Sequence, residues 1–237
     1  MMINISIIIP AYNEEKNILN TLNECFKALK NYSFNYEVIC VDDCSFDNTY
    51  KILKNYRENP ILLLRNKKNI GFGGSYWEGV KKSTNDIIFI LPGDNENNLN
   101  EILKYHRLLK KYEIVVPYPI NRKNTLFRKK LSYLFIKIIN FSFNTSFKYT
   151  NGSIIFKKKI LENIRFRDYS FLFMTSTLIQ AINNGKSYVE VPYNLNENFN
   201  HQTRNSSAFK IKNVFRLLSS YVYLLYFIKI KKNYKKL

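Results

Sequence analysis

Four short apolar runs in the first half of the chain each end in a cluster of polar residues. The runs are Ile5–Ile9, Val38–Val41, Ile61–Leu64 and Ile87–Leu91. Unbroken apolar runs bounded by turn residues are typical of strands buried on both faces, as in a parallel sheet covered by helices. Ligands of such sheets bind in the crevice outside the carboxyl ends of the strands. The runs therefore predict an α/β fold with a binding site where they end.

Carboxylates follow three of the four runs. Glu14 comes after the first run, Asp42 and Asp43 after the second, and Asp94 and Glu96 after the fourth. A structural role is least expected for carboxylates at this end of a buried sheet, whereas cation binding and phosphorylated ligands suit them. We therefore expect an enzyme site for a phosphorylated, metal-bound ligand.

Length and cysteine usage favour one intracellular domain. The 237 residues suffice for a single α/β domain, which we place at 1–207, with a C-terminal extension at 208–237. The three cysteines are too few and too close together for a disulfide scaffold, and the N-terminus lacks the layout of a signal peptide. A reducing cytoplasm is the expected compartment.

The net charge of +19 predicts an anionic partner, which could be a phosphate ligand, nucleic acid or anionic lipid. Beyond Ala208 the apolar residues recur at steps of three and four, and a lysine-rich tail follows. The apolar part is too short to span a bilayer, which needs about 20 residues. We expect a helix in the membrane interface with its tail on anionic headgroups. The alternative is a helix packed on the body of the protein with a solvated tail.

The order and spacing of the polar clusters resemble the inverting family 2 glycosyltransferases of GT-A fold. Within that family the chain is most similar to the dolichyl- and polyprenyl-phosphate sugar synthases. The similar segments, within roughly residues 3 to 215, are IIIPAYNEEKNI, YEVICVDDCSFDNT, NKKNIGFGGSYWEGVKKSTNDIIFILPGDNE, YTNGSIIFKKKIL, GKSYVEVPY and HQTRNSSAFKIKN. The resemblance implies a mostly parallel sheet flanked by helices and the transfer of a sugar from a nucleoside diphosphate donor.

The resemblance assigns the donor nucleoside to the first two strand ends. Pro10, Tyr12 and Glu14 would hold the base and ribose, and Asp42 or Asp43 would accept hydrogen bonds from them.

Helix capping is the other interpretation of these two loops. It would make Asn13 and Asp47 the caps of the helices that follow. A calcium loop starting at Asp43 is excluded, because its sixth position lacks glycine and its twelfth is Lys54.

Small residues follow the third run. Gly71 and Gly73 lack the third glycine of a dinucleotide fingerprint at the proper spacing. We expect both glycines to let the backbone approach the donor, with a simple turn as the alternative.

The cluster after the fourth run resembles the metal motif of the family, which is Asp-x-Asp followed by Gln two positions on. Here Pro92 replaces the first Asp, Asp94 matches the second and Glu96 replaces the Gln. We expect Asp94 to be essential for catalysis, and Asp94 and Glu96 to bind Mg²⁺ or Mn²⁺ together with the donor diphosphate. The metal would neutralise the departing nucleoside diphosphate. A turn with a helix cap before Leu99 is the alternative.

Basic residues in the second half are candidates for binding acceptor phosphate. Only Arg204 matches the phosphate-binding Arg-x-x-Gly-x-Ser-Lys segment of the synthases, and His201 lies in the same segment. Arg122 and Arg128 could supply the missing positive charge, although they could equally belong to the solvated start of a helix.

The favoured acceptor is a polyprenyl phosphate at the inner face of the plasma membrane, where the protein would be peripheral. Its phosphate oxygen is already a nucleophile, so no strong general base is required. A hydroxyl acceptor on a surface glycan or glycolipid would need such a base. A non-catalytic basic module for anionic membrane or nucleic acid is a third interpretation. Nucleic acid is not expected, because the aromatic residues fall in apolar helical stripes and do not alternate with basic ones.

Overall fold

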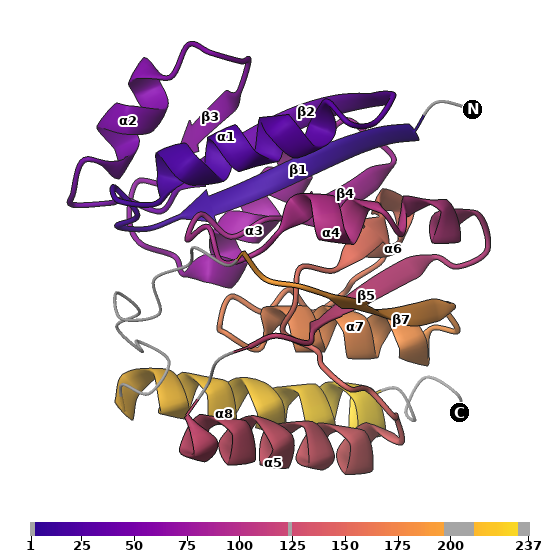
Figure 1. The fold of residues 1–237 in the computed structure, drawn as a ribbon. Helices are drawn as coiled ribbons and strands as arrows, with labels where there is room; N and C mark the ends of the chain where they lie inside the picture. Colours follow the sequence, from indigo (N-terminus) through magenta and orange to yellow (C-terminus); the bar gives the residue numbers. More distant parts are fainter. Residues whose placement is uncertain (1–2, 123–124, 197–210, 232–237) are drawn as a thin grey trace.

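The structure is a computed structural model that describes residues 3–122, 125–196 and 211–231 (Figure 1). Its seven-stranded sheet has the order β3-β2-β1-β4-β6-β5-β7. Only β6 runs antiparallel to its neighbours β4 and β5. The strands are β1 (Ile3–Ala11), β2 (Phe34–Asp42), β3 (Leu62–Arg65), β4 (Ile87–Ile90), β5 (Ile114–Pro119), β6 (Ile155–Lys157) and β7 (Tyr188–Tyr193).

Helices cover both faces of the sheet. Alternate residues of β1 enter two separate cores: Ile7 packs with α1 and α4 on one face, and Ile8 with α3 and α7 on the other. This alternation confirms that the central runs are buried on both faces. The helices are α1 (Ile18–Leu29), α2 (Thr49–Asn55), α3 (Phe72–Lys82), α4 (Leu99–Leu103), α5 (Leu126–Phe143), α6 (Lys158–Glu162), α7 (Phe173–Asn183) and α8 (Ile211–Leu225), with a 3-10 turn η1 (His106–Lys110) and a π-helical turn η4 (Tyr226–Lys231).

The third apolar run departs from the prediction of burial on both faces. It forms β3, an edge strand that pairs only with β2, and Leu62 at its start is 43% exposed. An edge position leaves one side of the strand without a neighbour, so a wholly apolar run here does not imply a central strand.

The C-terminal helix α8 packs one of its faces on the body of the protein. Leu224 is fully buried, the Tyr221 and Ser142 hydroxyl oxygens lie 2.5 Å apart, and Ser220 Oγ donates to Asp168 Oδ1. That face fits the alternative of a helix packed on the body. The proposed boundary between residues 207 and 208 lies outside the described residues. Within the described ranges, no helix has the length and apolar character needed to cross a bilayer.

Candidate functional site

The carboxyl ends of β1, β2 and β4 meet at one edge of the sheet. Ala11 is opposite Asp42 in the register of β1 and β2, and Gly93 N donates to Pro10 O at 3.1 Å. Positive φ angles gather here: Asn13 (56°), Cys44 (60°) and Asn95 (59°) follow these three strands. Non-glycine residues in this region are uncommon and cluster at functional sites. The geometry therefore supports the predicted position of the site.

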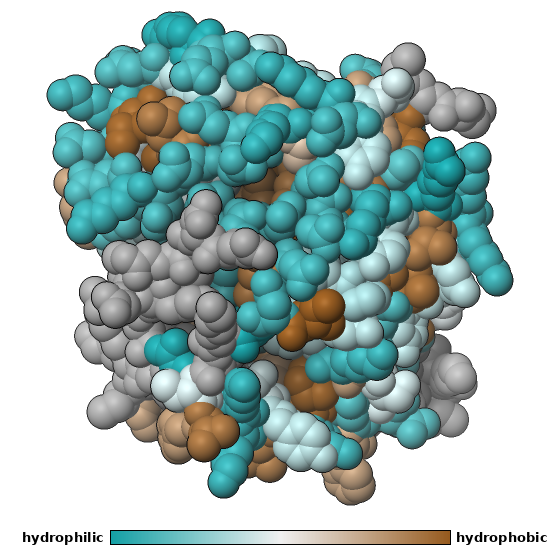
Figure 2. All heavy atoms as spheres, in the orientation of Figure 1, coloured by the Kyte–Doolittle hydropathy of each residue, from teal (hydrophilic) through white to brown (hydrophobic). Residues whose placement is uncertain are grey.

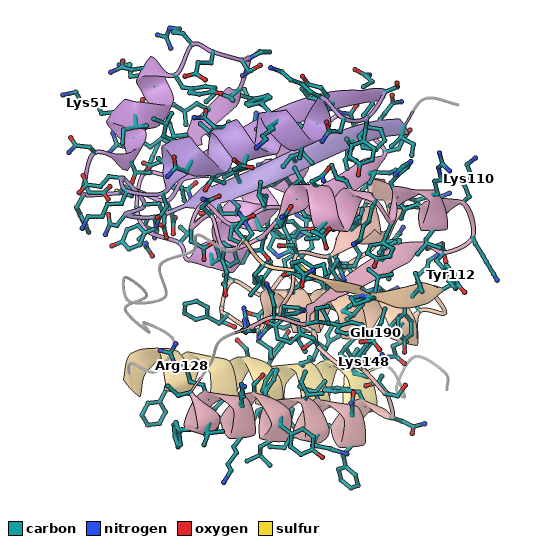
Figure 3. The ribbon with its side chains drawn as sticks, in the orientation of Figure 1. Lys51, Lys110, Tyr112, Arg128, Lys148 and Glu190 are labelled. Carbon is teal, nitrogen blue, oxygen red and sulfur yellow. The ribbon has the colours of Figure 1, made fainter. Side chains whose placement is uncertain are left out.

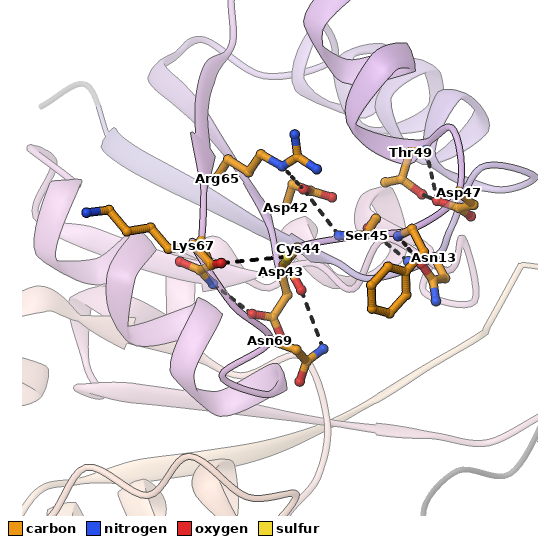
Figure 4. Close-up of polar contacts among 12 residues, drawn as sticks. Asn13, Asp42, Asp43, Cys44, Ser45, Asp47, Thr49, Arg65, Lys67 and Asn69 are labelled. Carbon is orange, nitrogen blue, oxygen red and sulfur yellow. Dashed lines mark hydrogen bonds and ion pairs between the residues drawn. The ribbon is translucent and has the colours of Figure 1, made fainter.

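Hydrogen bonds join the loop after β1 to the loop after β2 (Figure 4). Asn13 N donates to Ser45 Oγ at 3.0 Å, and Phe46 N donates to Asn13 Oδ1 at 2.9 Å. Asn13 therefore does not cap α1, whose N-cap is Asn17, and the capping interpretation of Asn13 was wrong. The Asn13 side chain fixes the neighbouring loop instead.

The same two loops are joined again further along. Glu14 N donates to Thr49 Oγ1 at 2.7 Å, and Glu15 N donates to Asp47 Oδ2 at 3.1 Å. Asp47 Oδ1 also accepts from Thr49 N, the first residue of α2, so the predicted contact of Asp47 with the start of this helix is present. The Glu14 carboxylate accepts a hydrogen bond from Asn17 Nδ2 at 2.8 Å.

Two aromatic rings stand at the outer margin of these loops. Tyr12 is 40% exposed and meets the exposed ring of Phe46 edge to face, with centroids 6.2 Å apart. An exposed aromatic ring beside buried carboxylates offers a surface on which a planar base can stack. The predicted donor residue Pro10 is buried at the end of β1.

The structure distinguishes the two aspartates at the end of β2. The Asp43 carboxylate is used within the protein, because Oδ1 accepts from Asn66 Nδ2 and Ile70 N, and Oδ2 accepts from Gly71 N. These three hydrogen bonds, at 2.8 to 2.9 Å, hold the loop between β3 and α3. Asp43 therefore has a structural role that the sequence did not reveal.

Asp42 differs in having one oxygen without a partner. Its Oδ2 is 3.2 Å from Arg65 Nε and accepts from Ser45 N at 3.4 Å. Its Oδ1 is buried and has no hydrogen-bond partner among the described residues. An unpartnered buried carboxylate oxygen costs free energy, so this atom is the better candidate for a ligand contact.

Gly71 and Gly73 are small because of contacts within the protein. Gly71 has φ +86°, and a Cβ atom there would lie 2.9 Å from Tyr169 O. A Cβ on Gly73 would lie 2.7 Å from Phe173 Cβ and 2.8 Å from Asp168 O. For both glycines, the close approach within the protein is to the segment before α7 and to its first residue, Phe173.

The loop after β4 contains Asp94 and Glu96 in different environments. Asp94 is half-buried and its Oδ1 accepts from Glu96 N at 3.1 Å. Glu96 is only 2% exposed, and its Oε1 is 3.2 Å from Arg122 Nη2. Arg122 therefore compensates the charge of the predicted metal ligand Glu96, which weakens the case for Glu96 as a ligand.

Arg122 is held from two sides. Its Nη1 donates to Tyr149 OH at 2.7 Å, while Nε is buried without a partner among the described residues. Burial would lower the pKa of Arg122, but the neighbouring Tyr149 and Glu96 outweigh it and raise the pKa. The guanidinium thus stays charged and keeps one N–H group without a partner.

Two further residues fix the loop after β4 and were not predicted. Tyr193 OH donates to Asn97 Oδ1 at 2.6 Å, and Asn196 Nδ2 donates to Asn95 O at 3.0 Å. Burial, with a smaller contribution from Tyr149, raises the pKa of Tyr193 and keeps its hydroxyl protonated. Tyr149 and Tyr193 lie in the YTNGS and VEVPY segments, but nothing in those patterns identified them individually.

The remaining predicted cations are Arg128, His201 and Arg204. Arg128 lies in the first turn of α5, where its backbone N–H donates to the N-cap Thr125. His201 and Arg204 lie outside the described residues. In the described part of the chain, no three His, Cys, Asp or Glu side chains form a group that could hold a metal ion.

A family model and several curated relatives match part of the chain. The family model described as glycosyl transferase family 2 matches residues 6–171. The chain is 31% identical over 140 residues to an undecaprenyl-phosphate 4-deoxy-4-formamido-L-arabinose transferase from Proteus mirabilis and 33% identical to its counterpart from Photorhabdus laumondii. Each alignment covers 57% of this chain and 42% of the relative, so the chain spans less than half of these relatives.

Two groups of solved structures share the fold. Glucosyl-3-phosphoglycerate synthase from Mycobacterium tuberculosis, in complex with Mg²⁺ and UDP, has a TM-score of 0.66 at 15% identity and covers 91% of this chain and 78% of its own. Residues 1–349 of TarS from S. aureus, in complex with UDP, have a TM-score of 0.57 at 20% identity, covering 80% and 60%. These similarities confirm the predicted GT-A fold.

Proposed function

Because the chain belongs to glycosyl transferase family 2, we propose that it transfers a sugar, with inversion, from a nucleoside diphosphate donor to a polyprenyl phosphate. One observation carries the proposal. The buried carboxylate of Asp42, the half-buried carboxylate of Asp94 and the buried guanidinium of Arg122 follow strands of one sheet at the edge where parallel strands bind ligands. We place the reaction at the inner face of the plasma membrane.

The first two loops form the nucleoside half of the proposed site. Asp42 Oδ1 has no partner in the described protein and would accept a hydrogen bond from the base or ribose. Tyr12 follows Ala11, the residue paired with Asp42, and presents an exposed ring on which the base would stack. Because the loops are already joined by hydrogen bonds, binding would require little rearrangement.

Asp94 forms the diphosphate side of the proposed site. Mg²⁺ is commonly bound through one or two carboxylates together with substrate phosphates, and Asp94 meets that minimum. A bound Mg²⁺ or Mn²⁺ would supply positive charge to the departing nucleoside diphosphate. Glu96 would act by holding Arg122 in place.

Arg122 forms the acceptor side. The curated relatives are named as undecaprenyl-phosphate sugar transferases, which supports a polyprenyl phosphate as acceptor. Arg122 Nε has no partner among the residues that the structure describes, and its N–H group could bind a phosphate oxygen. A phosphate oxygen is anionic near neutral pH and attacks without a general base, whereas a sugar hydroxyl would require one.

A transfer assay with defined substrates tests the proposal. The protein would be incubated with UDP-, GDP- and dTDP-sugars, with and without Mn²⁺, and a short-chain polyprenyl phosphate. Radioactive sugar should move into the organic phase with one donor class, and Glu101→Gln, a change in a surface ion pair, should retain this activity. Transfer only to a hydroxyl acceptor, or no transfer at all, would refute the proposed acceptor.

A further inference from the structure

Helix α5 has apolar residues on two faces. Ile136 and Ile139 are buried against the body, whereas Phe127, Leu131, Leu134, Ile138 and Phe141, spaced by three and four residues, are exposed. The exposure reaches 71% for Phe127 and 93% for Phe141. Soluble monomers rarely expose a contiguous apolar stripe of this kind. The structure therefore divides the apolar residues of this helix into an inward and an outward stripe.

Helix α8 extends this surface. It lies beside α5, because the ring of Tyr221 contacts Phe143 and its hydroxyl contacts Ser142. Phe215, Leu218 and Val222 of α8 and Tyr226, the first residue of η4, are exposed at similar spacing. Both helices lie at the lower end of the molecule in Figure 1, apolar side chains appear there in Figure 2, and side chains of α5 project away from the sheet in Figure 3. We call the two exposed stripes the apolar platform.

The net charge of the chain comes from two sequence segments that contain α5 and α8. Segments 114–161 and 198–237 contain ten and nine of the 37 Lys and Arg residues and none of the 18 Asp and Glu residues. The rest of the chain therefore has 18 cations against 18 acids, and the whole net charge of +19 belongs to these two segments. Within α5 the cations are Arg128, Lys129, Lys130 and Lys137.

We propose that the apolar platform docks on a bilayer that contains anionic lipid, with α5 as the main contact. Large apolar side chains interspersed with cations and free of acids are typical of helices that lie in a membrane interface. The lysine side chains would extend to lipid phosphates while the apolar stripe enters the acyl-chain boundary. A second copy of the chain is a poorer occupant, because two strongly cationic faces would repel each other. The sequence predicted membrane docking by the C-terminal helix and tail. We propose instead that α5 makes the main contact with the bilayer.

One end of the apolar platform lies on the same side of the molecule as the proposed site. The carboxyl end of β1 and the N-terminal end of α5, marked by Arg128, lie on the same side of the molecule (Figures 1 and 3). A lipid acceptor with its phosphate at headgroup level would therefore meet the open end of the sheet. This last point rests on the proposed function, whereas the docking itself does not.

Vesicle sedimentation tests the docking without donor or acceptor. Wild-type protein should bind phosphatidylcholine vesicles that contain phosphatidylglycerol, and binding should weaken with salt or without the anionic lipid. Leu134→Glu/Ile138→Glu should lower the partition coefficient at least about tenfold. The matched control is Leu19→Glu/Leu62→Glu, which places the same charges on exposed apolar positions of α1 and β3 and should bind much more tightly than the α5 variant. Equal binding by the two variants would overturn the proposal.

A second measurement leaves the apolar stripe intact. Phe141→Trp adds an indole at a 93% exposed position, while the native Trp77 is buried. Vesicles with brominated acyl chains should quench the new indole strongly and should not quench that of Leu19→Trp. Absence of quenching at position 141 would refute insertion of α5. If ultracentrifugation without lipid showed a dimer that Leu134→Glu/Ile138→Glu dissociates, a second copy would be the occupant instead.

The vesicle tests and the transfer assay have independent outcomes, so one proposal can be refuted while the other holds. The vesicles contain no polyprenyl phosphate, so docking can be observed if the proposed acceptor is wrong. A short-chain acceptor in detergent needs no vesicle, so transfer can be observed if the platform does not bind membranes.

Discussion

Glu96 Oε1 lies 3.2 Å from Arg122 Nη2, and this ion pair joins the loop after β4 to the segment after β5 across the intervening strand β6. Both side chains are largely buried, so removing one partner leaves the other without compensation. Glu96→Ala should lower the free energy of unfolding by about 2–4 kcal/mol. Glu96→Gln keeps a hydrogen-bond acceptor and should cost about half as much. Urea denaturation would measure both.

The control for this ion pair is an exposed one. Glu101 and Lys104 form a pair at 2.9 Å on the surface, so Glu101→Ala should cost less than about 1 kcal/mol. If Glu96→Ala is no more destabilising than Glu101→Ala, the buried pair does not stabilise the fold as inferred.

Asp94→Ala should abolish turnover and metal-dependent donor binding while the fold survives. Asp94 lies in the loop after β4, outside the core, and it matches the second Asp of the predicted metal motif. Turnover, together with calorimetry of nucleotide binding with and without Mn²⁺, would test this. Wild-type turnover in the variant would show that the metal site is elsewhere.

The two aspartates after β2 should give different phenotypes. Asp42→Ala should weaken nucleotide binding by about 1.5–3 kcal/mol, the usual value of a hydrogen bond to a charged group. Asp43→Ala should lower the free energy of unfolding by about 3 kcal/mol, since it removes three hydrogen bonds to the loop before α3. Calorimetry and denaturation of both variants would separate the roles. If both variants bind nucleotide with wild-type affinity, the nucleoside does not bind at the end of β2.

Glu37 predicts a pH dependence of stability. Burial would raise the pKa of Glu37, but hydrogen bonds from Ser6, Thr84 and Asn85 outweigh it and lower the pKa below 4.5. The unfolded state therefore binds the proton more readily, so the stabilisation is complete above pH 4.5 and is lost as the pH falls through the folded pKa.

The corresponding experiment compares Glu37→Gln with wild type at several pH values. The variant should be less stable by about 2 kcal/mol near neutral pH, and the difference should narrow toward about pH 3. Glu58→Gln, at an exposed position after α2, is the control and should differ little from wild type at any pH. A pH-independent difference for Glu37→Gln would contradict the assignment.

Leu224→Ala should destabilise the protein by about 2–4 kcal/mol, because Leu224 is fully buried where α8 packs on the body. Val222→Ala, two residues away and 62% exposed, should change stability by less than about 0.5 kcal/mol. Thermal unfolding would compare them. Truncation after Asn213 would remove Leu224 and should therefore impair folding as well as any vesicle binding.

The central sheet could be predicted because burial on both faces leaves a local signature. The runs that form β1, β2 and β4 are wholly apolar, and each is followed by polar residues. β3 was placed correctly, but its exposure depends on where it lies in the sheet. The antiparallel insertion of β6 between β4 and β5 depends on pairing between distant segments, which a run of three residues cannot specify.

The sequence predicted where the candidate site lies but not which hydrogen bonds and ion pairs its residues form. The residue types at the strand ends identified Asp42 or Asp43 and Asp94 as candidates, and Arg122 was a candidate for the positive charge missing from the second half. The use of Asp43 by the loop before α3, and of Glu96 by Arg122, depends on contacts between residues 26 to 28 positions apart. Likewise, the division of α5 into inward and outward stripes depends on which face of the helix packs on the body of the protein. Apolar periodicity along the sequence does not determine which face that is.

The hydrogen bonds that join the loops after β1 and β2 have a kinetic consequence. The conformational entropy of this end of the sheet is already lost on folding, so a nucleotide would find its nucleoside half preformed. Association should then proceed at similar rates for different nucleotides. Discrimination between bases should lie in how long each one stays bound.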